Sequence, residues 1–130
     1  MGQAIHPEGW APAKGYSNGY RIGNVLFIAG QVAWDAQQQI VGGTDFAAQF
    51  RQAIQNVRAV LDAAGATPEQ VGRVTVYVTD KDAYIAASRA VGAAWRESMG
   101  RHFPAMTLVQ VAALLEEGAM VEIEATAVLD

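Results

Sequence analysis

The sequence contains no cysteine, so disulfide bonds, thiol nucleophiles and thiolate metal ligands are all excluded. Only two histidines are present, His6 and His102, and they lie far apart in the chain without the spacing of a metal-binding motif. The sequence also lacks a Gly-rich phosphate-binding loop and the Gly-x-Ser-x-Gly motif of a serine nucleophile. We therefore expect no metal site and none of the common nucleotide-binding or serine-hydrolase functions.

Positive charge is scarce as well: nine Lys and Arg residues stand against thirteen Asp and Glu residues, which gives a net charge of −4. Because contacts to phosphates need a basic surface, we expect no nucleic acid as a partner. No run of about 18 apolar residues is present, so no membrane-spanning segment is predicted. The first residues lack a basic region followed by an apolar run, so no signal peptide is predicted. Together these absences predict a soluble, cytoplasmic protein without a membrane partner.

The chain does contain enough apolar material for one core, because hydrophobic residues make up 52% of its 130 positions. This length and composition predict a single domain over residues 1–130. Residues 1–15, with Pro7 and Pro12, are interpreted as an irregular lead-in. Two short β-prone runs follow at 20–22 and 25–29, and the Gly23-Asn24 dipeptide between them predicts a two-residue hairpin turn.

Two long helices are predicted. Apolar residues recur at three- and four-residue steps over 46–64, with Thr44 as the N-cap and Gly65 just after the end. The second helix is expected to start at 79–80 and to be closed by Gly100.

Three further strands are predicted at 73–79, 105–111 and 120–129. In the last of these, Glu122 and Glu124 share one face because side chains alternate with a period of two. The order β-β-α-β-α-β-β predicts an α+β fold with both helices on one face of a mixed sheet. The uncovered face should carry Tyr77, both glutamates and Gln110, and we expect it to meet another subunit.

Several spaced segments resemble one known family. They are Tyr16-Ser17, the run GNVLFIAGQ at 23–31, and then 57–65, 74–80, Pro104-Ala105 and 121–125. Across nearly the whole chain these segments resemble the Rid (YjgF-like) family of reactive-intermediate deaminases. The resemblance implies a chorismate-mutase-like α+β fold and a homotrimer whose sheets form a central barrel, with three ligand clefts between subunits. It also implies hydrolysis of 2-imino or 2-enamino acids to 2-oxo acids and ammonia, without a metal or organic cofactor.

The same resemblance implies candidate site residues. A family glutamate on the last strand helps to place the attacking water, and Glu124 matches that position, so it is the candidate catalytic residue, whereas Glu122 is interpreted as structural. The candidate substrate-binding residues are Tyr16, Gly30, Ser88, Met106, Thr107 and Leu108. Among them, Ser88 stands where the family has an asparagine, and Met106 stands where it has the arginine that pairs with the substrate carboxylate. The Thr107-Leu108 pair replaces a Ser-Cys or Ser-Thr pair.

The replacement of the arginine by Met106 has a physical consequence for ligand binding. An Arg–carboxylate pair supplies both charge and fixed geometry, and losing one side of a desolvated charge pair costs roughly 2–5 kcal/mol. Methionine supplies a flexible apolar wall instead. We therefore expect weak or absent activity on 2-imino acids and a ligand without a carboxylate at this end. Whether Arg21, Arg89 or Arg101 replaces the missing charge stays open, with Arg101 the first to check.

The leading hypothesis is a noncanonical Rid-type trimer that binds a small molecule in intersubunit clefts and hydrolyses a reactive imine or enamine. In this hypothesis Glu124 is the general base, and burial near Tyr16 and Met106 raises its pKa. The alternative for Glu124 is a structural role, paired with a backbone donor or a basic residue across the trimer. The alternative for the protein is a non-catalytic small-molecule-binding or regulatory module of the same fold. A stress-response role has no distinct sequence feature, and the acidic charge argues against the ribonuclease role with which some relatives are labelled.

Overall fold

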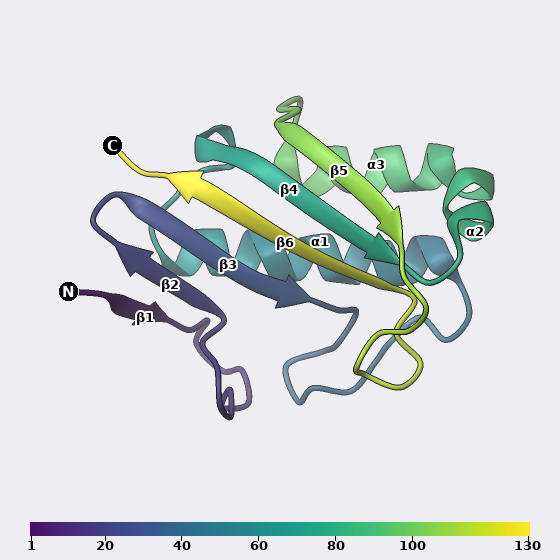
Figure 1. Cartoon of the computed structure of the whole chain (residues 1–130), viewed down its shortest axis with the longest axis horizontal. Helices are drawn as coiled ribbons and strands as arrows, with labels where there is room; N and C mark the ends of the chain where they lie inside the picture. Colours follow the sequence, from purple (N-terminus) through teal and green to yellow (C-terminus); the bar gives the residue numbers. More distant parts are fainter.

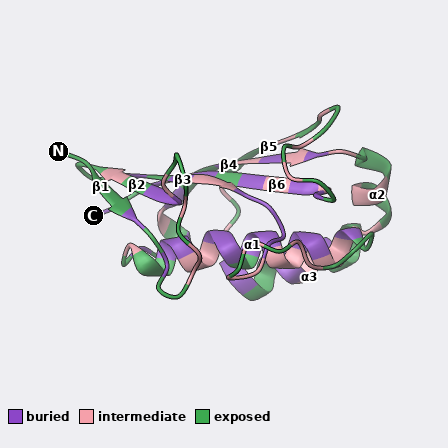
Figure 2. Cartoon of the chain, turned by 90° about the horizontal axis from the view of Figure 1, so that it is seen from below, coloured by how far each residue is buried: buried purple, intermediate pink, exposed green.

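The computed structural model describes residues 1–130 and consists of one six-stranded sheet with helices on one of its faces (Figures 1 and 2). The elements are β1 (Gln3–Ile5), β2 (Gly19–Ile22), β3 (Val25–Gln31), α1 (Phe46–Ala63), a 3₁₀ turn (Pro68–Gln70), β4 (Val71–Val78), α2 (Lys81–Ala86), α3 (Ser88–Met99), β5 (Ala105–Gln110) and β6 (Val121–Val128). The strand order is β1-β2-β3-β6-β4-β5, in which only β4 and β5 run parallel to each other. The predicted α+β fold with a mixed sheet is confirmed.

The N-terminal part of the sheet is an antiparallel meander. Ile22 lies opposite Val25, so Gly23 and Asn24 form the predicted two-residue turn, with Gly23 at a positive φ of 60°. The prediction of an irregular lead-in over 1–15 is wrong at residues 3–5, which form β1 and pair with β2. The reason is non-local, because the free edge of β2 supplies the hydrogen-bonding partners and three residues alone carry no strand pattern.

The core lies between the sheet and the helices. The long helix predicted over 46–64 is confirmed as α1, which lies along the sheet (Figure 2). Buried side chains alternate along the central strands and recur along the helix: Val74, Val76, Val78, Val121, Ile123 and Ala125 on the strands, and Phe50, Ile54, Val57 and Leu61 on α1. Full burial of each large aliphatic side chain stabilises the fold by about 1.5–3 kcal/mol relative to exposure.

The helix ends differ from the prediction in two places. Asp45 rather than Thr44 caps α1, because its carboxylate accepts a hydrogen bond from the Ala48 N–H at 3.2 Å. Gly65 follows the end of α1 with a φ of 71°, as predicted. The second predicted helix is divided into α2 and α3, because Ala87 between them leaves the regular helical conformation, with φ −97° and ψ 11°.

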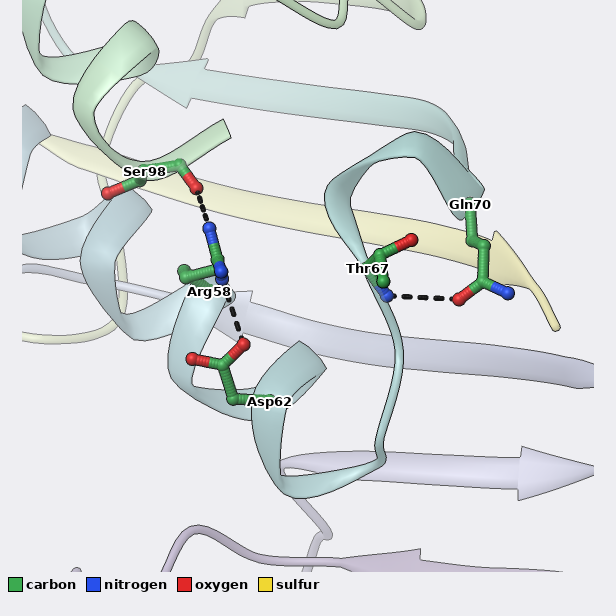
Figure 3. A network of polar contacts seen from close by, with 5 residues as sticks. All are labelled: Arg58, Asp62, Thr67, Gln70 and Ser98. Carbon is green, nitrogen blue, oxygen red and sulfur yellow. Dashed lines mark hydrogen bonds and ion pairs between the residues drawn. The ribbon is translucent and has the colours of Figure 1, made fainter. Parts of the chain in front are cut away.

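Polar contacts hold α3 against α1 (Figure 3). Arg58 of α1 donates from Nε to Asp62 Oδ1 at 2.8 Å and from Nη1 to the Ser98 carbonyl at 2.6 Å. The second bond satisfies a carbonyl at the end of α3 that has no partner within the helix. After α1, the side-chain oxygen of Gln70 accepts from the Thr67 N–H at 2.9 Å and closes the turn that leads into β4. The Arg58–Ser98 bond thus joins the end of α3 to α1.

The other face of the sheet carries no helix (Figure 2). Five large apolar side chains are exposed on this open face: Tyr20, Ile22, Phe27, Val109 and Val128. Tyr77, Glu122 and Glu124 lie on this face, as predicted. Tyr77 is in register with Glu122, and Glu124 is two residues further along β6.

Gln110 does not lie on the open face, so that part of the prediction is wrong. Its position opposite Val78 turns its side chain to the helix side, where its Oε1 accepts from the Lys81 N–H at 2.9 Å. It therefore binds the start of α2. None of the helices has the length and apolar character that crossing a membrane requires.

Candidate active site

Most of the candidate site residues divide between two hollows of the molecule. The first, the tyrosine pocket, has a volume of about 500 Å³ and is lined by Lys14, Tyr16, Ala29, Gly30, Val32, Trp34, Gln38, Leu115, Glu116 and Glu122. The second, the methionine groove, has a volume of about 180 Å³ and is lined by Phe50, Val76, Tyr84, Ser88, Val91, Gly92, Trp95, Arg96, Phe103, Met106 and Leu108. Tyr16 and Gly30 thus share one hollow, and Ser88, Met106 and Leu108 share the other.

Glu122 in the tyrosine pocket lies against Gly30. A side chain at position 30 would overlap the Glu122 carboxylate, so only glycine leaves room for it. The register between β3 and β6 shifts between Ile28 and Gln31, which places Gly30 at an irregularity of the strand. The bulge and the missing Cβ together let the Glu122 carboxylate lie close to the backbone of β3.

The tyrosine pocket raises the pKa of two acidic groups. Burial raises the pKa of the half-buried Glu122 carboxyl above its ordinary value of 4.5, and repulsion from Glu124 and then Glu116 adds to this. Burial and the charge of Glu116 raise the pKa of the Tyr16 hydroxyl, against a smaller lowering by its hydrogen bond with Gln38. A raised pKa makes the Glu122 carboxyl a better proton acceptor than an ordinary carboxylate, and Tyr16 stays protonated as a hydrogen-bond donor.

Gln38 orients the Tyr16 hydroxyl. Its Nε2 donates to Tyr16 Oη at 3.3 Å. Gln38 is the one non-glycine residue with a positive φ, at 63°, a conformation uncommon for residues with a side chain. A β-bridge between Trp34 and Ile40 closes the loop that holds it. Because Tyr16 accepts this bond, its own hydroxyl hydrogen is free to reach a ligand.

A chain of polar side chains supports the wall behind the pocket. Trp34 Nε1 donates to Gln31 Oε1 at 3.3 Å, and Gln31 Nε2 donates to Asn18 Oδ1 at 3.3 Å. Asn18 Nδ2 lies 3.0 Å from His6 Nδ1, so His6 belongs to the same network. Gln31 and Asn18 are both fully buried, and their hydrogen bonds offset the cost of that burial.

The methionine groove lies between β5 and α3. Met106 and Leu108 are in register with Val74 and Val76, so their side chains turn to the helix side of the sheet. Ser88 faces them from the first turn of α3. Thr107 alternates with these residues, is exposed, and does not line the groove.

Glu124 lies apart from both hollows. It is exposed on the open face, where the Tyr77 hydroxyl donates to its Oε2 at 3.2 Å, and it lines a small hollow with Ser17, Tyr20 and Phe27. The Glu124 charge is the largest of the effects that raise the pKa of Tyr77. The expected neighbours of Glu124, Tyr16 and Met106, line other surfaces. The hydrogen-bond partner of Glu124 is a tyrosine of its own chain.

The charge that Met106 lacks is not supplied by the arginines named from the sequence. Arg21 donates from Nε to the Gly23 carbonyl at 2.9 Å, and neither Arg89 nor Arg101 lines the tyrosine pocket or the methionine groove. Arg96 of α3, which no motif in the sequence marks, does line the groove. Position alone could have suggested it, because residues 88, 92 and 96 follow one face of a helix.

Three comparisons place the chain among known proteins. The family model described as Endoribonuclease L-PSP matches residues 7–129. The RutC family protein of Pyrococcus horikoshii is 34% identical over 116 residues, which cover 89% of this chain and 88% of that protein. The 2-iminobutanoate/2-iminopropanoate deaminase of Escherichia coli K12 is 33% identical over 129 residues, which cover 98% of each chain.

The comparison with solved structures leads to the same family. The crystal structure of the YjgF gene product of Escherichia coli superposes with a TM-score of 0.83 at 33% identity and covers 97% of this chain and 98% of that one. Family model, relatives and fold all converge over almost the full length. The chain belongs to the Rid (YjgF-like) family.

Proposed function

We propose that this protein hydrolyses a small reactive imine or enamine in a cleft between two copies of the chain, with Glu122 as the proton-transferring group. One observation carries the proposal: the Glu122 carboxylate, with its raised pKa, lies in the same hollow as the Tyr16 hydroxyl and against Gly30. The Escherichia coli relative named as a 2-iminobutanoate/2-iminopropanoate deaminase supports the reaction class.

The proposal needs two copies because of the distance across the sheet. β3, beside the tyrosine pocket, is separated from β5, beside the methionine groove, by β6 and β4. Three strand spacings amount to about 14 Å, and the two hollows lie on opposite faces. A small molecule cannot span them within one chain. A homotrimer in which the tyrosine pocket of one copy faces the methionine groove of the next would bring them together, and the exposed apolar side chains of the open face supply a surface for that assembly.

In the proposed reaction, water adds to the carbon of the C=N bond while the Glu122 carboxylate takes a proton from it. This proton is passed to the nitrogen, which gives a carbinolamine. Glu122 then takes the proton of the new hydroxyl group and passes it to the amino nitrogen, the C–N bond breaks, and ammonia leaves as the carbonyl forms. An enamine first takes a proton on carbon to become the imine. No net proton is consumed, so one carboxyl group that takes up and releases protons in turn is sufficient. Tyr16, held by Gln38, donates a hydrogen bond to the nitrogen or to the oxygen that develops negative charge.

The test compares Glu122→Gln with the matched variant Glu124→Gln. Both changes remove one carboxylate from the same face of β6. Removing a general base costs typically 10²–10⁴-fold in rate, so we expect Glu122→Gln to lose about that factor in kcat for ammonia release from imines generated in situ. Glu124→Gln should stay within a few-fold of wild type. The opposite pattern would restore the role that the sequence predicts for Glu124.

A non-catalytic binding module is the second candidate. The apolar lining at Met106 and Leu108 favours it, because binding there needs no reacting group. It would be supported if wild type bound small ligands but released no ammonia from any imine tested. In that case Glu122→Gln would leave ligand affinity nearly unchanged.

A further inference from the structure

The methionine groove has one cationic side chain at its rim. Arg96 lines it from the last turn of α3, and a Cβ placed on Gly92 would lie 3.4 Å from Arg96 Nη1. The guanidinium therefore folds back one turn along the helix and lies over Gly92. An alanine at position 92 would be in ordinary van der Waals contact with it.

Arg96 is an exposed residue whose guanidinium lies over a glycine. A glycine inside a helix costs roughly 0.5–1 kcal/mol relative to alanine, and Gly92 lies within α3 at a φ that alanine adopts freely. An arginine in the last turn also complements the helix dipole, but it would do so equally well while pointing into water. The two ion pairs of the chain, Arg51 with Glu97 and Arg58 with Asp62, leave Arg96 without a carboxylate partner.

The rest of the groove is apolar. Tyr84, Trp95, Phe103 and Met106 line it, and its volume of about 180 Å³ is enough for a group the size of a benzene ring. Ser88 lies four residues before Gly92, so about 6 Å of helix separates it from the guanidinium. An occupant that uses the groove fully has an anionic end at Arg96 and an apolar body extending toward Ser88.

We infer that the methionine groove binds a monocarboxylate whose carboxylate pairs with Arg96 and whose apolar body fills the space beside Met106. This inference rests on the proposed function, since the groove is one half of the same cleft, and it names the substrate class. The ligand carries its carboxylate at a distance from the reacting carbon.

The test uses 3-phenylpropanoate and its neutral analogue 3-phenylpropan-1-ol, which have the same apolar body and no imine. Calorimetry or NMR titration of the full-length protein at low salt should give an affinity for the acid about tenfold higher than for the alcohol. Arg96→Met should remove this preference, a change of about 1.4 kcal/mol, and Arg96→Lys should restore part of it. Arg89→Met is the matched control, because it removes the same charge from an exposed position of α3 outside the groove.

Three results would overturn the inference: no binding of the acid at millimolar concentration, equal affinity for acid and alcohol in wild type, or an equal loss in Arg89→Met and Arg96→Met. The two proposals fail separately because the probes cannot react. Arg96-dependent binding without hydrolysis of any imine would remove the proposed function and keep this inference. Imine hydrolysis together with binding of the acid that does not depend on Arg96 would keep the proposed function and remove this inference.

Discussion

Two features of the surroundings of Glu122, burial and nearby negative charge, both disfavour its ionised form. Its carboxylate is partly withdrawn from water beside Gly30, and Glu124 and Glu116 place further negative charge nearby. No Lys or Arg forms an ion pair with it. The ionised form is therefore disfavoured in the folded chain, which is useful for proton transfer and unfavourable for stability.

This leads to a prediction on stability against pH. A carboxyl whose pKa is raised on folding contributes stability that is complete below its unfolded value of 4.5 and is lost as the pH rises through the folded value. Glu122→Gln should therefore unfold at a higher urea concentration than wild type at pH 7.5, and the difference should disappear near pH 4. Urea unfolding at both pH values measures it. Glu8→Gln, at an exposed position outside the pocket, serves as the control and should show no such trend. A gain that is equal at both pH values would contradict the raised pKa.

At the scale of elements, the loop between β5 and β6 brings Leu115 and Glu116 to the tyrosine pocket. One buried side chain of α1 binds this loop at several points. Gln49 is fully buried, and its Nε2 donates to the Gly118 carbonyl at 2.8 Å and to the Gly43 carbonyl at 2.7 Å. Its Oε1 accepts from the Met120 N–H at 2.8 Å.

Gln49→Leu should detach this loop, because leucine keeps the volume and leaves three backbone groups without partners. Each unpaired buried group costs about 1–3 kcal/mol, so we expect a loss of at least 2 kcal/mol in the free energy of unfolding. Faster amide hydrogen exchange over residues 111–120 should accompany it. The control is Gln55→Leu, at an exposed position of the same helix. Unchanged exchange in the loop of Gln49→Leu would show that other contacts hold it.

The sequence predicted those elements whose signals are local. Periodicity and Gly65 located α1, and Gly23-Asn24 located the hairpin, because both signals lie within one segment. It missed β1, which depends on the edge of β2, and the break at Ala87, which no Gly or Pro marks. The candidate site was less predictable from the sequence than these elements. Alternation showed that Glu122 and Glu124 share a face, but only the contact of Glu122 with Gly30, across two strands, separates their surroundings.

At the scale of the whole molecule, charge and family description point in different directions. The matching family model is described as an endoribonuclease, whereas this chain has a net charge of −4. Phosphate contacts require Lys and Arg, and the two hollows hold one of each: Lys14 in the tyrosine pocket and Arg96 in the methionine groove. The expectation that nucleic acid is not a partner stays a prediction. Two cationic side chains in separate hollows suit a small ligand better than a polyanion.

The open face supplies the last prediction, because the proposed cleft exists only if the copies assemble through it. Phe27 is 47% exposed in the middle of β3 on this face, and Ile85 is 61% exposed on α2, away from it. We expect wild type to sediment at three times the chain mass of 13.8 kDa. Phe27→Glu should bury an unpaired charge in each interface, give monomers at micromolar concentration and lose imine hydrolysis although Glu122 is intact.

Ile85→Glu is the matched control for assembly, because it places the same charge on an exposed apolar position outside the open face. It should remain a trimer by sedimentation equilibrium. A monomeric Phe27→Glu variant that keeps its wild-type kcat would mean that one chain holds a complete site. The tyrosine pocket would then act without the methionine groove. The separation of about 14 Å between β3 and β5, which is three strand spacings, would no longer require two copies.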